Sequence, residues 1–521
     1  MLLFAERRGH RRIATASATI ALALIALLAF SHRAEAAELL YWDNYSATPQ
    51  TISVANGDGS AGGLLNLTGT TLSDPEGMAI DTVTGRLFVA SSNGGGGTGQ
   101  ILAVNLNGSG ANVFSAPGAL VDEPYGVVLD PATRIIYWAN AGSGDSENGS
   151  IAWAKLDGSS GGLLNTAGAL VANPYKIGLD PVNGRVYWGN HPKGGEESIS
   201  FANVNNTGGG NLSLSRPPDS SYAFAVDSAA GRLYWSEGQQ DRFAYTGLLG
   251  GTVNTLDTSG AVVDSSYGFA VDPTLNKISW PNYGNDENPV NGLGFASLSG
   301  GSGGNISPTA PFNGPQDLLV LKSPTGTAAP AIARNAKNRA ALSCSTGGWA
   351  ADFAGGYVYQ APTTYAYQWL RNGRPVAGAT AATLAAKSAG SYSCTVTAAN
   401  QAGSATQTSA ATTVKAAKVK LTTKKKGKGE PGNQVTFKVK AVNQGDLKPK
   451  SAKVCVKLPK ASKADLKAPK CKKLVQLEGR AKKTVTIKVK VKPGAEEGTD
   501  KLTFQVKGAA GKAAKSKIVV K

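Results

Sequence analysis

The sequence contains very few histidines, cysteines and methionines, with 3, 4 and 2 of them among 521 residues. Two of the histidines fall within the first 36 residues, so the rest of the chain has only His191. A Ser-His-Asp or Cys-His catalytic arrangement would have to use that one residue. His191 lies in the Gly-rich segment "GNHPKGGEE", which predicts a solvated loop histidine rather than a catalytic one.

The four cysteines are Cys344, Cys394, Cys455 and Cys471, and they fall in two separate regions. An even number of cysteines in an exported chain indicates disulfides. Local pairing is the simplest scheme, so we expect Cys344–Cys394 and Cys455–Cys471. Cysteines used in this way leave none for a zinc cluster.

Long apolar runs are absent except near the N-terminus, at residues 13–30. Four arginines precede this run, and Ala34-Glu35-Ala36 follows it as a small-x-small cleavage site. The pattern predicts a signal peptide over residues 1–36, with a membrane anchor as the alternative. No second run is long enough to span a bilayer. We therefore expect a secreted or extracellular protein, free or associated with the cell wall, without a transmembrane segment once the signal peptide is removed.

Residues 418–521 lack arginine and aromatic side chains almost completely. They contain 30 basic and 7 acidic residues, but Arg480 is the only arginine, and Phe437 and Phe504 are the only aromatics. Without aromatic side chains for bases to stack on, nucleic acid is not expected as a partner. An exported lysine-rich surface favours anionic cell-envelope polymers instead. The alternative is a lysine face that is merely solvated.

What the chain does contain is a repeated phrase. A copy combines an innermost segment ending in Asp, a turn that often contains Gly-Arg, and a Tyr-Trp pair. The Asp residues recur every 45 to 50 positions, at 81, 130, 180, 227 and 272. The five whole copies lie at residues 75–91, 124–140, 174–190, 221–237 and 266–282.

A repeat of this length, built from several short strands, is typical of a propeller blade. Two half copies, "LLYWDN" at 39–44 and "PQDLLVL" at 315–321, flank the five whole ones. They complete a sixth blade if the strand at 317–321 pairs with the strand that starts at Leu39, which closes the ring. In each copy the Asp carboxylate should cap the turn, and the Tyr-Trp pair should pack between blades.

The phrases resemble the YWTD repeats of six-bladed propellers of the LDL-receptor type, over residues 37–322. No copy reads Tyr-Trp-Thr-Asp; the copies read YWDN, FVAS, YWAN, YWGN, YWSE and SWPN. The resemblance implies the fold but not the biology of a receptor.

Residues 326–415 resemble a bacterial immunoglobulin-like domain through "ALSCSTGG", "AYQWLRNGRPVAGAT" and "AGSYSCTVTAANQAGSA". The resemblance implies that Cys344 and Cys394 bridge two sheets, that Trp369 packs on the disulfide and that Tyr392 forms a tyrosine corner. Two departures are Ser388, which stands at the usual Asp position, and an insertion between Cys344 and Trp369.

Residues 418–521 alternate lysine with Val, Ile and Phe at period two, which predicts an antiparallel sheet buried on one side. The pattern resembles the adhesion-related β-sandwich repeats of bacterial surface proteins. The whole chain is thus expected to be all-β: a signal peptide, a six-bladed propeller and two β-sandwich domains.

One repeat position supplies the candidate ligand-binding residues, because the residue entering each innermost strand should lie at one end of the central channel. Tyrosines there could stack on a sugar or grip a peptide, or they could simply pack on the neighbouring blades. The six residues are Glu76, Tyr125, Tyr175, Tyr222, Tyr267 and Gln316.

Oxygen-rich loops are the only other candidate site. Loops with these oxygens could hold calcium, but the tight Asp-x-Asp-x-Asp spacing is missing, so solubilising loops are the better interpretation and no cofactor or metal is expected. The loop residues are Asp74, Asp122, Glu123, Asp145, Glu147, Glu196, Glu197, Asp264, Asp286 and Glu287, with Asn44, Asn140, Asn190 and Asn282.

These features favour a bacterial surface or secreted protein that is not an enzyme. The propeller would recognise an extracellular glycan or protein, the immunoglobulin-like domain would act as a spacer, and the lysine-rich domain would hold the envelope. One alternative is a metal-dependent propeller hydrolase, such as a lactonase or a lyase, with Glu76 and Gln316 near the metal. Another is a purely structural wall component.

Overall fold

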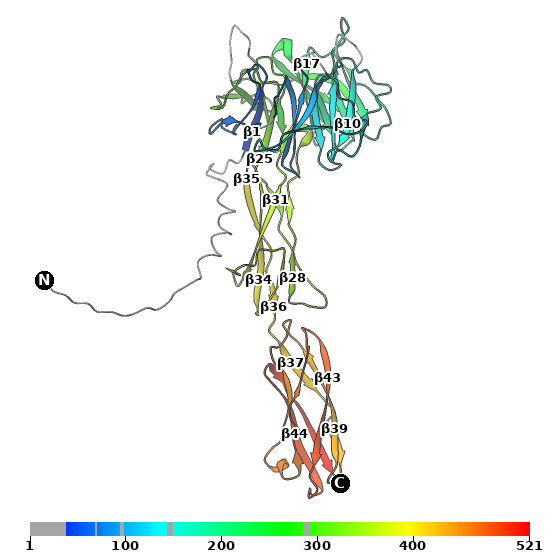
Figure 1. Cartoon of the computed structure of the whole chain (residues 1–521), viewed down its shortest axis with the longest axis vertical. Coiled ribbons are helices and arrows are strands. Elements are labelled where there is room, and N and C mark those ends of the chain that lie inside the picture. The colour runs from blue at the N-terminus through cyan, green and yellow to red at the C-terminus, as the bar shows by residue number, and fades with distance from the viewer. Residues whose placement is uncertain (1–37, 68–69, 94–97, 143–148, 285–291) are drawn as a thin grey trace, which may run out of the picture.

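The computed structural model describes residues 38–67, 70–93, 98–142, 149–284 and 292–521. The predicted signal peptide lies outside them. The described chain is almost entirely β-structure, with a six-bladed propeller followed by two β-sandwiches. Figure 1 shows the propeller at one end of an elongated molecule and the lysine-rich sandwich, with the C-terminus, at the other. No helix within the described ranges is both long and apolar enough to cross a bilayer.

Each blade is an antiparallel sheet of four strands, ordered from the channel outward. The innermost strands are β25 (Leu318–Lys322), β4 (Pro75–Asp81), β8 (Pro124–Asp130), β12 (Ile177–Asp180), β17 (Ser221–Asp227) and β21 (Ala270–Asp272). The second strands are β1 (Glu38–Asn44), β5 (Arg86–Ser91), β9 (Ile135–Asn140), β13 (Arg185–Asn190), β18 (Arg232–Glu237) and β22 (Lys277–Pro281).

The third strands are β2 (Thr51–Asn56), β6 (Gln100–Asn105), β10 (Ser150–Lys155), β14 (Ser198–Asn203), β19 (Arg242–Gly247) and β23 (Leu293–Ser297). The outermost are β3 (Gly63–Leu64), β7 (Asn112–Phe114), β11 (Gly161–Leu163), β15 (Gly209–Asn211), β20 (Gly250–Thr255) and β24 (Gly304–Ile306), with β16 (Ser213–Leu214) added beside β20. The short helix η1 (Gly238–Gln240) follows β18.

The ring closes as the half copies predict. Strand β25 pairs antiparallel with β1, with Leu40 opposite Val320. The last strand of the repeat region thus becomes the innermost strand of the first blade, so the sheet has no free inner edge where the chain begins.

The repeated phrase folds as expected at the turn. Asp81 Oδ1 accepts from Val83 N at 3.1 Å, and Asp180 Oδ1 accepts from Val182 N at the same distance. The glycine of the turn adopts a left-handed conformation, as in Gly85 with φ of 68°. Where the third blade has no glycine, Arg134 adopts φ of 61° instead, so the repeat needs this backbone geometry at that position.

The tryptophans are the wedges between blades. Trp42, Trp138, Trp188, Trp235 and Trp280 are all at most 1% exposed. Trp138 Nε1 donates to Leu120 O at 2.8 Å, and Trp188 Nε1 donates to Leu170 O at 3.0 Å. Each accepting carbonyl lies 18 residues upstream, in the segment that enters the blade. A buried indole with its N–H satisfied fixes each blade to the connection before it.

The middle sandwich has a sheet ordered β32 (Arg374–Pro375), β31 (Thr364–Arg371), β34 (Gly390–Asn400) and β35 (Gly403–Thr408), with β36 (Thr412–Val414) on β34. The other sheet contains β27 (Ile332–Arg334), β28 (Ala341–Cys344) and β33 (Thr383–Ala385), and β26 (Gly326–Ala328) pairs with β29 (Gly348–Trp349). Cys344 and Cys394 form the predicted disulfide between the sheets. Trp369 is fully buried, and the Tyr392 hydroxyl donates to Ser388 O at 2.7 Å.

The insertion between Cys344 and Trp369 enters the propeller. It forms the short helix η2 (Ala354–Gly356) and strand β30 (Val358–Tyr359), which pairs parallel with β25. The Tyr357 hydroxyl donates to Ile177 O across the channel. Residues 352–360, called the plug from here on, therefore fill the channel from the end where the innermost strands finish.

The lysine-rich sandwich has two five-stranded sheets. The β39 sheet contains β41 (Leu466–Lys467), β43 (Lys482–Val491), β39 (Gln434–Asn443), β37 (Lys418–Thr422) and β45 (Ala510–Lys512). The β44 sheet contains β38 (Lys426–Gly429), β46 (Ala514–Val520), β44 (Gly498–Lys507), β40 (Lys453–Lys457) and β42 (Lys472–Lys473). Helix η3 (Ala461–Lys463) lies in the loop closed by the predicted disulfide Cys455–Cys471.

Candidate functional site

Four of the predicted site residues form a continuous row of aromatic rings at the channel mouth, the end where the innermost strands begin. The ring centroids of Tyr125 and Tyr175 are 4.5 Å apart, those of Tyr175 and Tyr222 are 5.6 Å apart, and those of Tyr222 and Tyr267 are 4.8 Å apart. All four side chains are half-buried. The tyrosines therefore pack on one another and still present part of their surface outward.

Two further tyrosines extend this row. Tyr283 lies 5.2 Å from Tyr267, and Tyr45 lies 6.5 Å from Tyr283, between ring centroids. We call the six residues Tyr125, Tyr175, Tyr222, Tyr267, Tyr283 and Tyr45 the tyrosine arc. Tyr45 and Tyr283 directly follow the second strands "YWDN" and "SWPN", so the repeat alignment contained the signal for them at a position that the sequence analysis did not consider.

His191 occupies the same repeat position as Tyr45 and Tyr283, and the prediction of a solvated loop histidine was wrong. Its ring stacks on Tyr222 with a centroid distance of 5.2 Å and an interplanar angle of 10°. Nδ1 lies 3.1 Å from Glu197 Oε1, and Nε2 lies 3.1 Å from Ser221 O. Both partners, a carboxylate oxygen and a backbone carbonyl, are hydrogen-bond acceptors. Tyr222 and Ser221 belong to the neighbouring blade, so the Gly-rich local sequence did not indicate these two contacts, whereas Glu197 lies in the same segment as His191.

Glu76 and Gln316 take the remaining positions of the ring. Glu76 is only 5% exposed, and Ser92 Oγ donates to its Oε1 at 3.5 Å. Gln316 is half-exposed, and its backbone N–H donates to Asp43 Oδ1 at 3.0 Å. Glu76 therefore brings a buried carboxyl to the mouth beside the tyrosine arc.

One residue further along, the innermost strands of neighbouring blades lie very close to one another. Glycine or alanine occupies this position in four of them. A Cβ on Gly126 would lie 2.6 Å from Lys176 Cα, and a Cβ on Gly268 would lie 2.6 Å from Asp317 Cα. Lys176 and Asp317 hold this position in the fourth and first blades, which face each other across a ring of six.

Lys176, Asp317, Asp43 and Glu76 form a buried charged cluster beneath the arc. Asp43 and Asp317 are 0% and 4% exposed and accept backbone hydrogen bonds, including 2.7 Å from Asp317 N to Asp43 Oδ1. Lys176 is 5% exposed, and its Nζ has no hydrogen-bond partner among the described residues. Lys176, Asp317 and Asp43 were not among the site residues predicted from the sequence. Their signal is a charged side chain where the other repeats have small or apolar ones.

Burial controls the protonation of this cluster. Burial raises the pKa of Asp43 to about 7 and that of Glu76 to about 8, and it also raises the pKa of Asp317. The charge of Lys176 acts in the opposite direction on all three carboxyls. Near neutral pH the channel therefore retains protons that exposed carboxyls would lose.

These shifts predict how stability depends on pH. The protonated forms are favoured in the folded state, so their contribution is complete below the ordinary carboxyl pKa and is lost as pH rises through about 7 to 8. We expect the propeller's melting temperature to fall between pH 5 and pH 9 and to fall less in Glu76→Gln. Calorimetry at constant ionic strength measures this, with the exposed Glu430→Gln as control. An equal fall in both variants would contradict the assignment.

The asparagines expected in exposed loops are buried instead, which corrects that interpretation. Asn44, Asn140, Asn190 and Asn282 are at most 1% exposed. Asn140 Oδ1 accepts from Asp122 N at 3.0 Å, and Asn190 Oδ1 accepts from Ala172 N at 2.9 Å. Each asparagine ties the end of a second strand to the segment entering its blade. Because they are buried against that segment, these asparagines have a structural role.

The acidic loop residues divide into two sets. Asp145, Glu147, Asp286 and Glu287 lie outside the described residues. Of the others, Glu123 and Asp264 are buried, and Glu197 is bound to His191. Within the described part of the chain, no group of three or more His, Cys, Asp or Glu side chains has an arrangement that could hold a metal ion.

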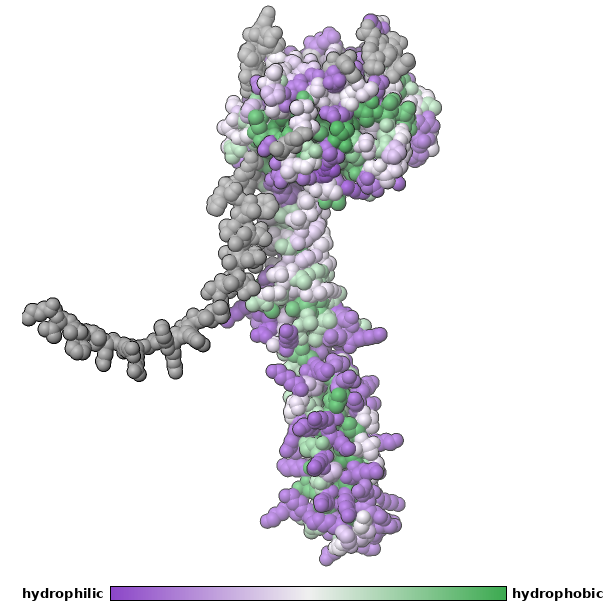
Figure 2. Space-filling model, viewed as in Figure 1, coloured by the Kyte–Doolittle hydropathy of each residue, from purple (hydrophilic) through white to green (hydrophobic). Residues whose placement is uncertain are grey.

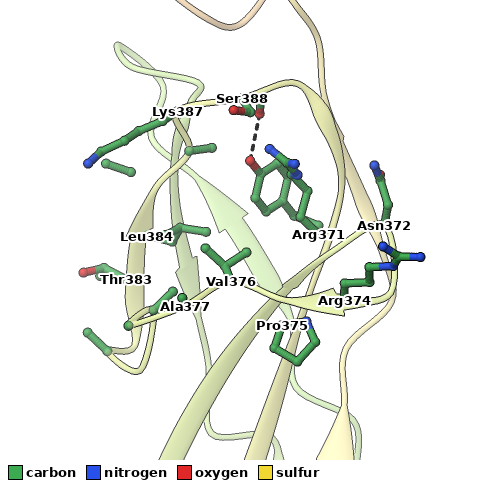
Figure 3. Close-up of a pocket in the computed structure, with 16 residues that line it drawn as sticks. Arg371, Asn372, Arg374, Pro375, Val376, Ala377, Thr383, Leu384, Lys387 and Ser388 are labelled. Atoms are coloured by element: carbon green, nitrogen blue, oxygen red, sulfur yellow. Dashed lines mark hydrogen bonds between the residues drawn. The ribbon is translucent and has the colours of Figure 1, made fainter. Parts of the chain in front are cut away.

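A separate surface hollow lies on the middle sandwich, in a different domain from the tyrosine arc. Its volume is about 1040 Å³, and Arg371, Arg374 and Lys387 are the charged residues that line it. Figure 3 shows Arg371 and Arg374 on one side and Lys387 on the other, with Val376 and Leu384 between them. No carboxylate of the described residues lines the hollow.

Comparisons with known proteins concern the fold only. No protein-family model and no curated protein matches the sequence. TolB from Acinetobacter baumannii is similar at 14% identity and a TM-score of 0.40, over 57% of this chain and 69% of TolB. A protein from Lactobacillus plantarum reaches 15% and 0.36, over 55% of this chain and 99% of its own. A proposed 6-phosphogluconolactonase from Bacteroides uniformis reaches 12% and 0.35, over 59% and 88%. Sequence identities and TM-scores this low give no information about the ligand or the activity of this chain.

Proposed function

We propose that this chain is a secreted or cell-surface binding protein of a bacterium, and that the tyrosine-arc face of its propeller recognises an extracellular ligand. One observation carries the proposal. The plug enters the channel from the end where the innermost strands finish, and the tyrosine arc lies at the opposite end. The two sandwiches thus form a stalk on one side of the propeller (Figure 1), so neither sandwich covers the tyrosine face.

The chemistry of the face favours a glycan or an extended peptide as ligand. Each tyrosine offers an apolar ring face and a polar hydroxyl, which together suit the C–H faces and hydroxyls of sugars. Beneath the rings, Lys176 Nζ is a donor without a hydrogen-bond partner among the described residues, and the Glu76 carboxyl interacts electrostatically with it. A hydroxyl group can accept from the first and donate to the second.

A double substitution tests the face. Once a glycan and peptide array has identified a ligand, Tyr175→Ala with Tyr222→Ala should weaken its binding at least tenfold, about 1.4 kcal/mol. The reason is the loss of two adjacent rings from the middle of the arc. Calorimetric titration of the full chain measures the change.

The matched control is Tyr365→Ala, a tyrosine of the middle sandwich that is 41% exposed. It should leave the affinity within twofold of the parent. If the ligand binds the double variant as tightly as the parent, the tyrosines are packing residues only and the proposed site is wrong.

The rest of the chain fits a role in display and attachment. The middle sandwich resembles an immunoglobulin-like domain and would space the propeller from the surface. The lysine-rich sandwich would hold anionic polymers of the cell envelope by charge. Figure 2 shows hydrophilic side chains along this sandwich. Attraction of this kind weakens with salt, since the screening length is only about 8 Å near physiological ionic strength.

An enzymatic function is the second candidate, and the buried carboxyls Asp43, Glu76 and Asp317 are the observation that favours it. Clustered carboxyls with raised pKa values are typical of catalytic sites as well as binding sites. Lys176 places one positive charge among them, where a hydrolase of the metal-dependent type would need a cation. A stoichiometric divalent ion bound to the purified protein, lost in Glu76→Gln, would favour the enzyme.

A further inference from the structure

The two sheets of the lysine-rich sandwich expose lysine in different registers. On the outer face of the β44 sheet, lysines of adjacent strands stand directly opposite one another. Lys517 is opposite both Lys426 and Lys501, and Lys453 is opposite both Lys507 and Lys473. All six side chains are exposed. We call these two sets of three the lysine rows.

Each row places like charges at close range. Strands lie about 4.8 Å apart, and directly opposite side chains start from Cβ atoms about 4.5–5.5 Å apart. Like charges in such pairs destabilise a sheet. None of the six lysines has an ion pair with a described residue, whereas Lys448 of the same sandwich is paired with Glu478 at 3.0 Å. The positive charges of the lysine rows are therefore not neutralised by any carboxylate of the described chain.

The central strands of the β39 sheet show that lysine can be accommodated without this repulsion. Lys438 stands opposite Thr486, and Lys488 stands opposite Thr436. Lys440 has Thr484 on one side and Thr422 on the other. At the edges of the β39 sheet, Lys420 stands opposite Lys512 and Lys467 stands opposite Lys490, but the residue on the other side is Val442 or Gln434. The two sheets share the alternation of lysine with apolar residues, so the register decides whether lysines stand in rows of three. An anion that contacts three aligned lysines can neutralise all three positive charges at once.

We propose that the lysine rows bind a linear polymer with repeated phosphate or carboxylate groups. The proposal rests on the proposed attachment function and assigns it to one face. A row of three strands spans about 10 Å, and the six residues from Lys501 to Lys507 place the second row about 20 Å from the first. Lys515 and Lys457, on either side of Thr503, continue the positive charge between the rows. A polymer reaches both rows, whereas a single small anion reaches only one.

Matched triple variants of the full chain test the assignment. K426Q/K501Q/K517Q removes one lysine row, and K438Q/K440Q/K488Q removes three exposed lysines from the β39 sheet with the same change in net charge. The probes are polygalacturonate, a polycarboxylate, and inorganic polyphosphate, with neutral dextran as a blank. At low salt, the row variant should bind at least tenfold more weakly and the β39-sheet variant less than twofold more weakly. The polymer that shows the larger ratio identifies the anion.

A second readout needs no polymer. Removing one row removes repulsion, so K426Q/K501Q/K517Q should melt at a higher temperature than the parent at low salt, with the difference lost near 1 M salt. The β39-sheet variant should not gain stability.

If both triple variants bind the polymer equally weakly, the lysine rows are not the binding site, and attachment by overall charge remains as the explanation. Absence of binding by the parent to either polymer would overturn both the rows and the proposed attachment.

Discussion

A chain that ends at Asn313 is expected to lose cooperative melting of the propeller, because it lacks β25. Leu318, Leu319 and Leu321 are fully buried in this strand, and Val320 is 3% exposed. Burial of four such side chains contributes about 6–12 kcal/mol. The whole stability of a domain is about 5–15 kcal/mol. Loss of one strand therefore removes most of the margin, and it also exposes the unpaired backbone of β1.

The control is a chain that ends at Ser323, which keeps β25. Both chains lack the plug and the two sandwiches, so they differ mainly in the closing strand. Circular dichroism melting and size-exclusion chromatography compare them. Closure by β25 is refuted if the shorter chain is soluble and melts cooperatively at the same temperature as the longer one.

Tyr357→Ala is expected to lower the propeller's stability by about 3–5 kcal/mol, the range for removing a large buried aromatic side chain. Tyr357 is 5% exposed and belongs to the core cluster of the propeller, although the chain on either side of the plug belongs to the middle sandwich. Its hydroxyl donates to Ile177 O, and the adjacent Val358 pairs with Val320. Loss of the ring should also separate the melting of the propeller from that of the middle sandwich.

The companion variant Tyr357→Phe keeps the ring and removes the hydroxyl. It should cost about 1–3 kcal/mol, because the buried carbonyl of Ile177 loses its donor. Differential scanning calorimetry of the full chain resolves both effects. A Tyr357→Ala protein with unchanged transitions would show that the plug adds little to the ring.

The repeat determined the fold of the propeller. Strand identity, the turn capped by Asp81 and its equivalents, and the buried tryptophans all depend on residues within one copy or at the join of two adjacent copies. The half copies at 39–44 and 315–321 also predicted the pairing of β1 with β25. Period-two alternation predicted the lysine-rich sandwich, and the separation of the cysteines into two regions predicted the disulfides.

The candidate site was only partly predictable. Tyr125, Tyr175, Tyr222 and Tyr267 were found because equivalent repeat positions converge on the channel axis. Lys176, Asp43 and Asp317 were missed, although each departs from small or apolar residues in the other copies. The contacts of His191 with Tyr222 and Ser221 come from the next blade, so its own loop could not indicate them.

The plug was decided by the tertiary structure alone. The sequence marked residues 352–360 only as part of an insertion, and "DFAGGYVYQ" has neither the period of the blades nor that of the sandwiches. The hydrogen bond from Tyr357 to Ile177 O joins residues 180 positions apart. Periodicity reports which face of a strand is buried, and it does so within a few residues. An aperiodic insertion such as the plug is buried in a channel that exists only after the six blades have closed. The folded ring therefore determined which end of the channel is filled and which end stays open.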